Sequence, residues 1–209
     1  MTILRAVAWD IDGTLIDSEG LHHRALVETC RAHGADISDL PDDTFRGVHM
    51  LDVWTRLEPR FPERLQRQEW LDAVERSYIT HCGGLTPMPE AITTVRALAA
   101  RGITQACVSN SGRAVVDANI RALGIGDCLA FSISLDDVSA GKPDPAPYLL
   151  AAVRMGVAPE TAVAVEDSSA GALSARRSGM VVLRYGDEKG EERDRWIAHL
   201  SDVLGLFDA

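Results

Sequence analysis

The chain has 209 residues, of which 46% are hydrophobic and 25% charged, and this fits one globular domain or a core domain with a smaller insertion. Its net charge of −10 argues against nucleic acid as a partner, because phosphate backbones are held by clustered Lys and Arg. No apolar run is long enough to span a membrane and no leader pattern precedes the first elements, so we predict no membrane association and a cytoplasmic location. Nothing indicates an obligate oligomer, and we expect a monomer.

The hydrophobic pattern changes twice along the chain. Residues 3–9 predict a strand buried on both faces, whereas residues 18–85 are helical in pattern and are divided by prolines into several short helices. From residue 86 onward, strands alternate with helices, and a last helix is expected from about Glu192. The later strands are predicted at 104–108, 129–134, 161–165 and 180–183. We therefore predict an α/β fold, with a Rossmann-like parallel sheet covered by helices on both faces. Residues 1–17 and 86–209 would form the core, and residues 18–85 an inserted α-helical cap.

The segment Asp10-Ile11-Asp12-Gly13-Thr14 places two carboxylates where the first strand ends. Ligands of open α/β sheets bind outside the carboxyl ends of the strands. One acid can act there as a nucleophile while the other moves a proton, and both suit a hard cation such as Mg²⁺. A plain turn is the alternative, but a calcium loop is excluded because Thr14 and Leu21 stand where such a loop needs ligands.

Polar clusters also follow three later strands. Ser109-Asn110-Ser111-Gly112 offers hydroxyl, amide and backbone N–H groups to an anionic oxygen, although the same residues are ordinary helix caps. Lys142 lies between Gly141 and Pro143 and can neutralise a phosphoryl group, unless it is simply a surface lysine in a turn. Glu166 and Asp167 are costly at the end of an apolar strand unless they bind a cation, although Asp167 can also cap a helix.

These four clusters together resemble the motifs of the haloacid dehalogenase superfamily of hydrolases, in the subgroup with an inserted helical cap. The resemblance covers nearly the whole chain. It implies that Asp10 forms an aspartyl-phosphate, that Asp12 acts as acid and base, and that Ser109 and Lys142 hold phosphoryl oxygens. It further implies a Mg²⁺ cofactor held by Asp10, the Asp12 carbonyl and Asp167, with Glu166 at or near the metal.

Asp12 decides the class of reaction, because the dehalogenases of this superfamily do not have the second aspartate. Within the capped subgroup the chain is similar to β-phosphoglucomutase and to sugar-phosphate phosphatases. His22 and the loop containing Gly47 match cap residues of the mutase and are predicted, with Asn110, to contact substrate; His22 can equally be an ordinary helix residue. His49 stands where the mutase has an arginine that grips a second phosphate.

We therefore predict a Mg²⁺-dependent phosphatase acting on a small phosphorylated metabolite, with a sugar phosphate as the expected substrate. A phosphosugar mutase is the first alternative. A non-catalytic binding module is the second, and the complete set of acids, serine and lysine speaks against it.

Overall fold

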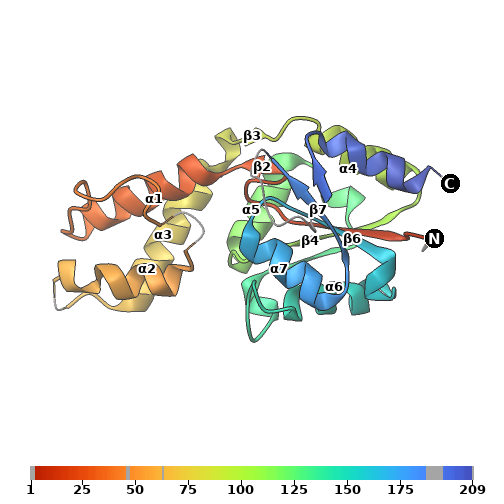
Figure 1. Cartoon of the computed structure of the whole chain (residues 1–209). Coiled ribbons are helices and arrows are strands. Elements are labelled where there is room, and N and C mark those ends of the chain that lie inside the picture. Colours follow the sequence, from red (N-terminus) through yellow and green to blue (C-terminus); the bar gives the residue numbers. More distant parts are fainter. Residues whose placement is uncertain (1–2, 46–47, 63, 187–194, 209) are drawn as a thin grey trace. The chain divides into compact units, whose positions relative to one another are not determined.

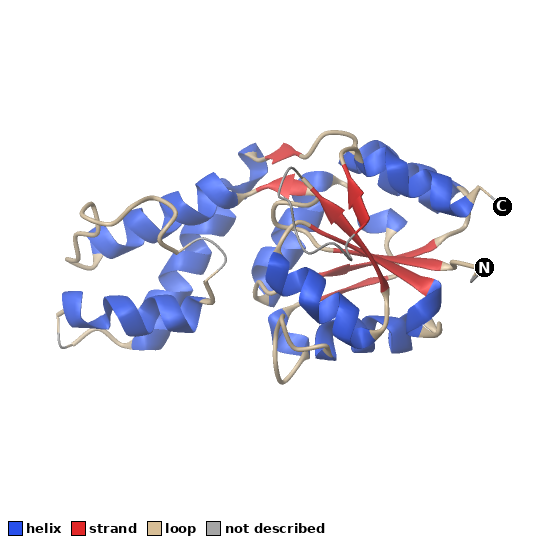
Figure 2. Ribbon diagram, in the orientation of Figure 1, coloured by secondary structure: helices blue, strands red, loops and turns tan. Residues whose placement is uncertain are grey.

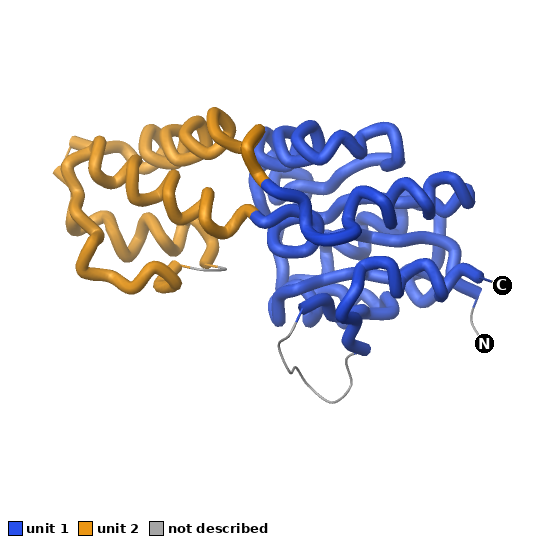
Figure 3. The backbone as a smooth tube through the Cα atoms, turned by 90° about the horizontal axis from the view of Figure 1, so that it is seen from above, with its two compact units in different colours: residues 1–17, 86–209 blue, residues 18–85 orange. Residues whose placement is uncertain are grey.

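The computed structural model describes residues 3–45, 48–62, 64–186 and 195–208. The chain divides into two compact units, one formed by residues 1–17 and 86–209 and the other by residues 18–85 (Figure 3). Among the described helices, none is both long and apolar enough to cross a membrane.

The larger unit is built on a parallel sheet of six strands. Their order is β5-β4-β1-β6-β7-β8, and every neighbouring pair is parallel. The strands are β1 (Ala6–Trp9), β4 (Thr104–Val108), β5 (Phe131–Ile133), β6 (Ala162–Glu166), β7 (Val181–Tyr185) and β8 (Arg195–Ile197). The predicted Rossmann-like fold class is confirmed, and β1 occupies the interior position that parallel sheets give to continuous apolar runs.

Helices cover both sides of this sheet (Figure 2). Helix α4 packs against the 3₁₀ helix η6, and α6 packs against α7 on the opposite side (Figure 1). The elements are α4 (Ala91–Ala100), α5 (Arg113–Leu123), α6 (Ala146–Met155), α7 (Ser169–Ser178) and η6 (Leu200–Phe207). Short 3₁₀ turns complete the connections at η3 (Gly126–Cys128), η4 (Leu135–Asp137) and η5 (Pro159–Thr161).

The core beneath these helices is mostly apolar, and it contains a buried polar network around Gln105. All four residues of β1 have no exposed surface, and the same holds for β6. The indole N–H of Trp9 donates to Gln105 Oε1 at 2.9 Å, and Gln105 Nε2 donates to the carbonyl of Val95 at 2.9 Å. This buried glutamine therefore links two neighbouring strands to α4.

The end of the chain differs from the sequence prediction. Glu192, where a last helix was expected to begin, lies outside the described residues, and Arg195–Ile197 forms the edge strand β8. The prediction of a helix was wrong for residues 195–197, because these residues form a strand that is stabilised by pairing with β7. The helical turns that follow are confined to η6.

The smaller unit is helical. It contains α1 (Glu19–Ala32), α2 (Met50–Leu57), α3 (Arg67–His81) and the 3₁₀ turns η1 (Glu58–Arg60) and η2 (Cys82–Gly84). Helices α1 and α3 pack together, and the rings of Trp54, Phe61 and Trp70 form a cluster with centroids 5.4–5.8 Å apart.

Two short strands stand where the chain leaves and re-enters the larger unit. Strand β2 (Ile16–Asp17) pairs antiparallel with β3 (Thr86–Pro87), so that Asp17 lies opposite Thr86. The entry and exit points of residues 18–85 are thus held together by backbone hydrogen bonds of the larger unit.

Candidate active site

Four polar clusters meet at the carboxyl edge of the sheet because their strands are neighbours. Asp10 follows β1, Ser109 follows β4 and Glu166 ends β6, while Lys142 lies in the loop between η4 and α6. Strand β1 pairs with both β4 and β6, so its carboxyl end lies between theirs. The sheet order therefore brings Asp10, Ser109 and Glu166 within reach of one another, and the loop after η4 adds Lys142.

Lys142 is the centre of the cluster. Its Nζ lies 2.6 Å from Asp10 Oδ1 and 2.6 Å from Glu166 Oε1, and it donates to the carbonyl of Val108 at 2.8 Å. Burial lowers the pKa of this ammonium, but the attraction of Asp10 and Glu166 is larger in sum and leaves the pKa raised. The lysine is therefore charged at neutral pH and is not in a surface turn.

The carboxyl of Asp10 is held from both sides. Its Oδ1 contacts Lys142, and its Oδ2 accepts a hydrogen bond from the Thr14 hydroxyl at 2.9 Å. The pKa of Asp10 is raised, chiefly by burial and next by repulsion from Glu166, while Lys142 acts in the opposite direction. The ammonium of Lys142 alone therefore does not offset the effects that disfavour the ionised carboxylate of Asp10.

The acids beside Asp10 offer donors suited to a hard cation. Ligand oxygens of Asp10, Glu166 and Asp167 all lie within 4.8 Å of one another. Carboxylate oxygens are the donors that Mg²⁺ prefers, and a divalent ion would balance the charge left over by Lys142. Gly13 leaves room for this arrangement, since a Cβ there would lie 2.2 Å from Asp167 Oδ2. The residues present therefore fit Mg²⁺.

Asp12 lies among neutral donors rather than beside the lysine. Its Oδ2 accepts from the hydroxyls of Ser109 at 3.2 Å and Ser111 at 3.1 Å, and its Oδ1 accepts from Asn119 Nδ2 at 3.1 Å. Among the hydrogen bonds of the described residues, Asp10 thus accepts from an ammonium and a hydroxyl, whereas Asp12 accepts from two hydroxyls and an amide.

Asn110, predicted to contact substrate, is engaged with the backbone of Lys142. Its Oδ1 accepts from the Lys142 N–H at 2.7 Å, and its Nδ2 donates to the Lys142 carbonyl at 3.0 Å. Gly141 lets the two loops approach, because a Cβ there would lie 2.7 Å from Asn110 Oδ1. In this structure Asn110 therefore positions the lysine loop.

Glu166 is completely buried, and both of its oxygens have protein partners. Oε1 accepts from the Tyr148 hydroxyl at 2.5 Å in addition to contacting Lys142, and Oε2 accepts from the Ser168 hydroxyl at 3.1 Å. A Cβ at Gly171 would lie 2.0 Å from the carboxyl group. The position of the Glu166 carboxyl group is thus fixed by contacts with the protein itself.

The two remaining predicted residues belong to the unit formed by residues 18–85. His22 lies in the helical unit and stacks on Tyr78 with ring centroids 4.3 Å apart, a contact that also suits an ordinary helix residue. Gly47 lies outside the described residues.

Several site residues escaped the sequence prediction because long-range contacts bring them in. They are Asn119, Tyr148, Gly171 and Arg184. Of these residues, only Gly171 could have been recognised from the sequence, because it is a glycine in the first turn of the helix that follows Glu166 and Asp167. Nothing in the local pattern around Asn119 or Tyr148 distinguishes them from core residues.

A doubly wound sheet with paired acids and a buried lysine at its carboxyl edge defines a hydrolase of the haloacid dehalogenase-like class. The chain belongs to this family: the family model for haloacid dehalogenase-like hydrolases matches residues 4–179.

Relatives of the chain include phosphatases. The chain is 31% identical to hexitol phosphatase A of Escherichia coli (strain K12), in an alignment covering 84% of this chain and 80% of that protein. It is 30% identical to phosphoglycolate phosphatase of Yersinia pseudotuberculosis serotype I, over 96% of this chain and 92% of that protein. The predicted family and the predicted enzyme class, a phosphatase of the haloacid dehalogenase type, are confirmed.

The fold of the chain is also similar to that of solved structures. CbbY from Rhodobacter sphaeroides in complex with phosphate superposes with a TM-score of 0.85 at 24% identity, covering 99% of this chain and 100% of that chain. A β-phosphoglucomutase from Clostridium difficile gives a TM-score of 0.80 at 18% identity, covering 99% and 98%. At these identities the superpositions establish the shared fold.

Proposed function

We propose that this enzyme is a Mg²⁺-dependent phosphatase that hydrolyses a small sugar phosphate through an aspartyl-phosphate formed on Asp10. The observation that carries the proposal is the convergence of Asp10, Lys142 and Asp167, which unites a nucleophile, a buried cation and a cation ligand. The names of the relatives support a small phosphorylated metabolite as substrate, since they include hexitol and phosphoglycolate phosphatases.

In the first step a carboxylate oxygen of Asp10 attacks phosphorus, and the bond between phosphorus and the leaving oxygen breaks. Asp12 gives its proton to that oxygen, and the alcohol departs. In the second step water attacks the phosphorus of the aspartyl-phosphate while Asp12 takes its proton, which releases inorganic phosphate and restores Asp10. A covalent intermediate divides one hard displacement into two easier ones.

Lys142 stabilises the phosphoryl oxygens in both steps, because its charge is secured by two carboxylates and lies in a water-poor site. Ser109 is proposed to hold a phosphoryl oxygen as well, and its hydroxyl reaches Asp12 in the structure. Asp10, the Asp12 carbonyl and Asp167 would hold Mg²⁺, which reduces repulsion between carboxylate and phosphate when bound. Glu166 would act beside the metal by holding Lys142.

We further propose that residues 18–85 form the cap that selects the substrate, through residues such as His22 and the segment around Gly47. Selection by a closing cap would assemble the site and exclude water only around a fitting sugar.

The proposal is tested by measuring phosphate release from a panel of sugar phosphates and phosphoglycolate, with and without EDTA. We expect Asp10→Asn to abolish release and EDTA to suppress it until Mg²⁺ is restored. Turnover by the Asp10 variant, or turnover unaffected by the chelator, would refute the mechanism. Incubation with a hexose 1-phosphate and its bisphosphate separates the mutase alternative, which predicts an isomerised sugar instead of free phosphate.

A further inference from the structure

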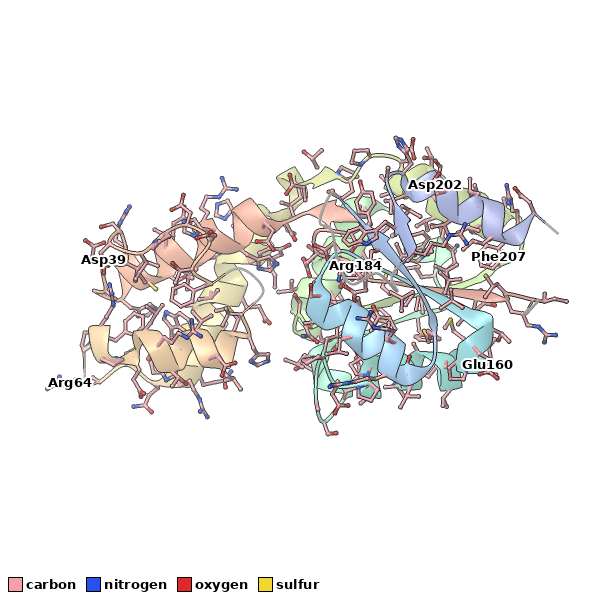
Figure 4. All side chains as sticks on the ribbon, viewed as in Figure 1. Asp39, Arg64, Glu160, Arg184, Asp202 and Phe207 are labelled. Carbon is pink, nitrogen blue, oxygen red and sulfur yellow. The ribbon has the colours of Figure 1, made fainter. Side chains whose placement is uncertain are left out.

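Arg184 is a buried cation that the proposed chemistry does not use. It lies on β7, paired in register with Glu166 of β6, and only 2% of its surface is exposed. Figure 4 labels it within the larger unit. A guanidinium remains charged at any ordinary pH, so its burial is costly unless polar groups replace the lost water.

The guanidinium contacts the turn that carries the acidic pair. Nη2 donates to the carbonyl of Asp167 at 2.7 Å, and Nη1 donates to the carbonyl of Ser168 at 2.8 Å. Its other side faces Trp196 of β8, with Cζ 4.9 Å from the ring centroid. Two consecutive carbonyls are thus bridged by one planar group, which is the geometry that arginine provides and lysine does not.

These two carbonyls belong to the peptide groups that flank the start of α7. Ser168 is the N-cap residue of that helix, and its hydroxyl accepts from the Gly171 N–H at 3.0 Å while donating to Glu166. The turn is therefore fixed from one side by the cap and from the other by Arg184. With the backbone of Asp167 held in this way, few directions remain for its carboxylate.

The direction of that carboxylate matters for metal binding. The Thr14 hydroxyl, which donates to Asp10, lies 3.4 Å from Asp167 Oδ1, so the Asp167 side chain points toward Asp10. An octahedral Mg²⁺ tolerates little error in the placement of its ligands. A small rotation of the Asp167 peptide would move the carboxylate out of this arrangement.

We infer that Arg184, backed by Trp196, is a positioning residue that sets the cation affinity of the site by fixing the backbone of Asp167. The inference rests on the proposed function in one respect, namely that Asp167 is a metal ligand. It adds a residue outside the acid, serine and lysine motifs to the machinery of this chain.

The test measures Mn²⁺ binding to the full-length protein by electron paramagnetic resonance, without substrate. Mn²⁺ prefers the same oxygen ligands as Mg²⁺ and is directly observable. We expect Arg184→Met to weaken Mn²⁺ binding by about 10- to 100-fold, the range typical for partners of metal ligands. Arg184→Lys keeps the charge but reaches one carbonyl instead of two, so we expect an intermediate loss.

Arg101→Met is the control. Arg101 also donates to a backbone carbonyl, that of Leu204, and it donates to the carboxylate of Asp208. We expect wild-type Mn²⁺ affinity in this variant. A purely structural role of Arg184 would lower the urea midpoint and leave the Mn²⁺ affinity of the folded protein unchanged, which would overturn the inference.

If Arg184→Met does not fold, Arg184→Lys decides, and wild-type affinity in that variant would likewise overturn the inference. Failure of the wild type itself to bind Mn²⁺ would instead refute the metal dependence of the proposed function, and the inference with it. The two failures are thus distinguishable.

Discussion

Gly171 offers a sharp test of how tightly Glu166 is held. An alanine Cβ at this position would lie 2.0 Å from the carboxyl carbon and both oxygens of Glu166, whereas real Cβ contacts are essentially never shorter than 3.0 Å. The carboxyl group must therefore move by about 1 Å, the difference between these two distances. Because Glu166 has no exposed surface, this movement disturbs its bonds to Lys142 and Tyr148.

The magnitude follows from two opposing effects. Replacing Gly by Ala in a helix favours folding by up to about 1 kcal/mol. Overpacking costs about 1–3 kcal/mol, and a hydrogen bond to a charged group contributes on the order of 1.5–3 kcal/mol. We therefore expect Gly171→Ala to lower the free energy of unfolding by about 1.5–5 kcal/mol. We also expect it to lower kcat by about 100-fold, since a misplacement of about 1 Å can cost that much.

The assay combines urea unfolding, followed by tryptophan fluorescence, with phosphate release from an aryl phosphate. Gly20→Ala is the control, because Gly20 also lies in the first turn of a helix and a Cβ there meets nothing within 4 Å. We expect that control to be as stable as the wild type or more stable, and fully active. A Gly171→Ala variant with wild-type stability and activity would show that Glu166 does not occupy this place.

Three further variants test other parts of the larger unit. Tyr148→Phe should lower kcat by about 10-fold with an unchanged fold by circular dichroism, because Glu166 loses a charge-assisted hydrogen bond; unchanged kcat would contradict this. Gln105→Leu should lower the free energy of unfolding by about 2–4 kcal/mol, since Trp9 loses its acceptor, and a neutral result in urea would count against the buried network. Burial would raise the pKa of Asp137, but hydrogen bonds to its carboxylate outweigh this effect and leave the pKa lowered. The contribution of Asp137 to stability is therefore fully present above its usual pKa of 3.8, and it is lost as the pH falls through the lower pKa of the folded state. Asp137→Ala should therefore be less stable than wild type at pH 7, with a difference that shrinks below pH 3.8; a constant difference in acid unfolding would refute this.

The sheet was predictable from the sequence because its strands are long enough to carry their own signal. Strands β1, β4 and β6 are apolar runs that end in polar residues, and the sequence pattern placed each of them within three residues of its observed bounds. Strand β8 has three residues and an exposed arginine, and it depends on pairing with β7. Such a strand leaves no periodic pattern, so the sequence prediction assigned this region to a helix.

Within the site, the sequence indicated the residues that bear charge but not those that orient them. Glu166 stood out because a charge at the end of an apolar strand needs a partner, and Lys142 stood out because it lies in a loop between a glycine and a proline. Asn119 and Tyr148 carry neutral groups inside helices, and their roles depend on partners 107 and 18 residues away along the chain. Only the packing of α5 and α6 reveals those contacts.

The pairing of β2 with β3 bears on which insertions this chain tolerates between Asp17 and Thr86. Since Asp17 and Thr86 are already opposite each other, a two-residue turn would close the larger unit without residues 18–85. The loop-closure entropy of a longer insert grows only by about 0.6 kcal/mol for each doubling of its length. The β2–β3 pair would therefore allow helical insertions of other lengths to replace residues 18–85 without a change in the register of the six-stranded sheet.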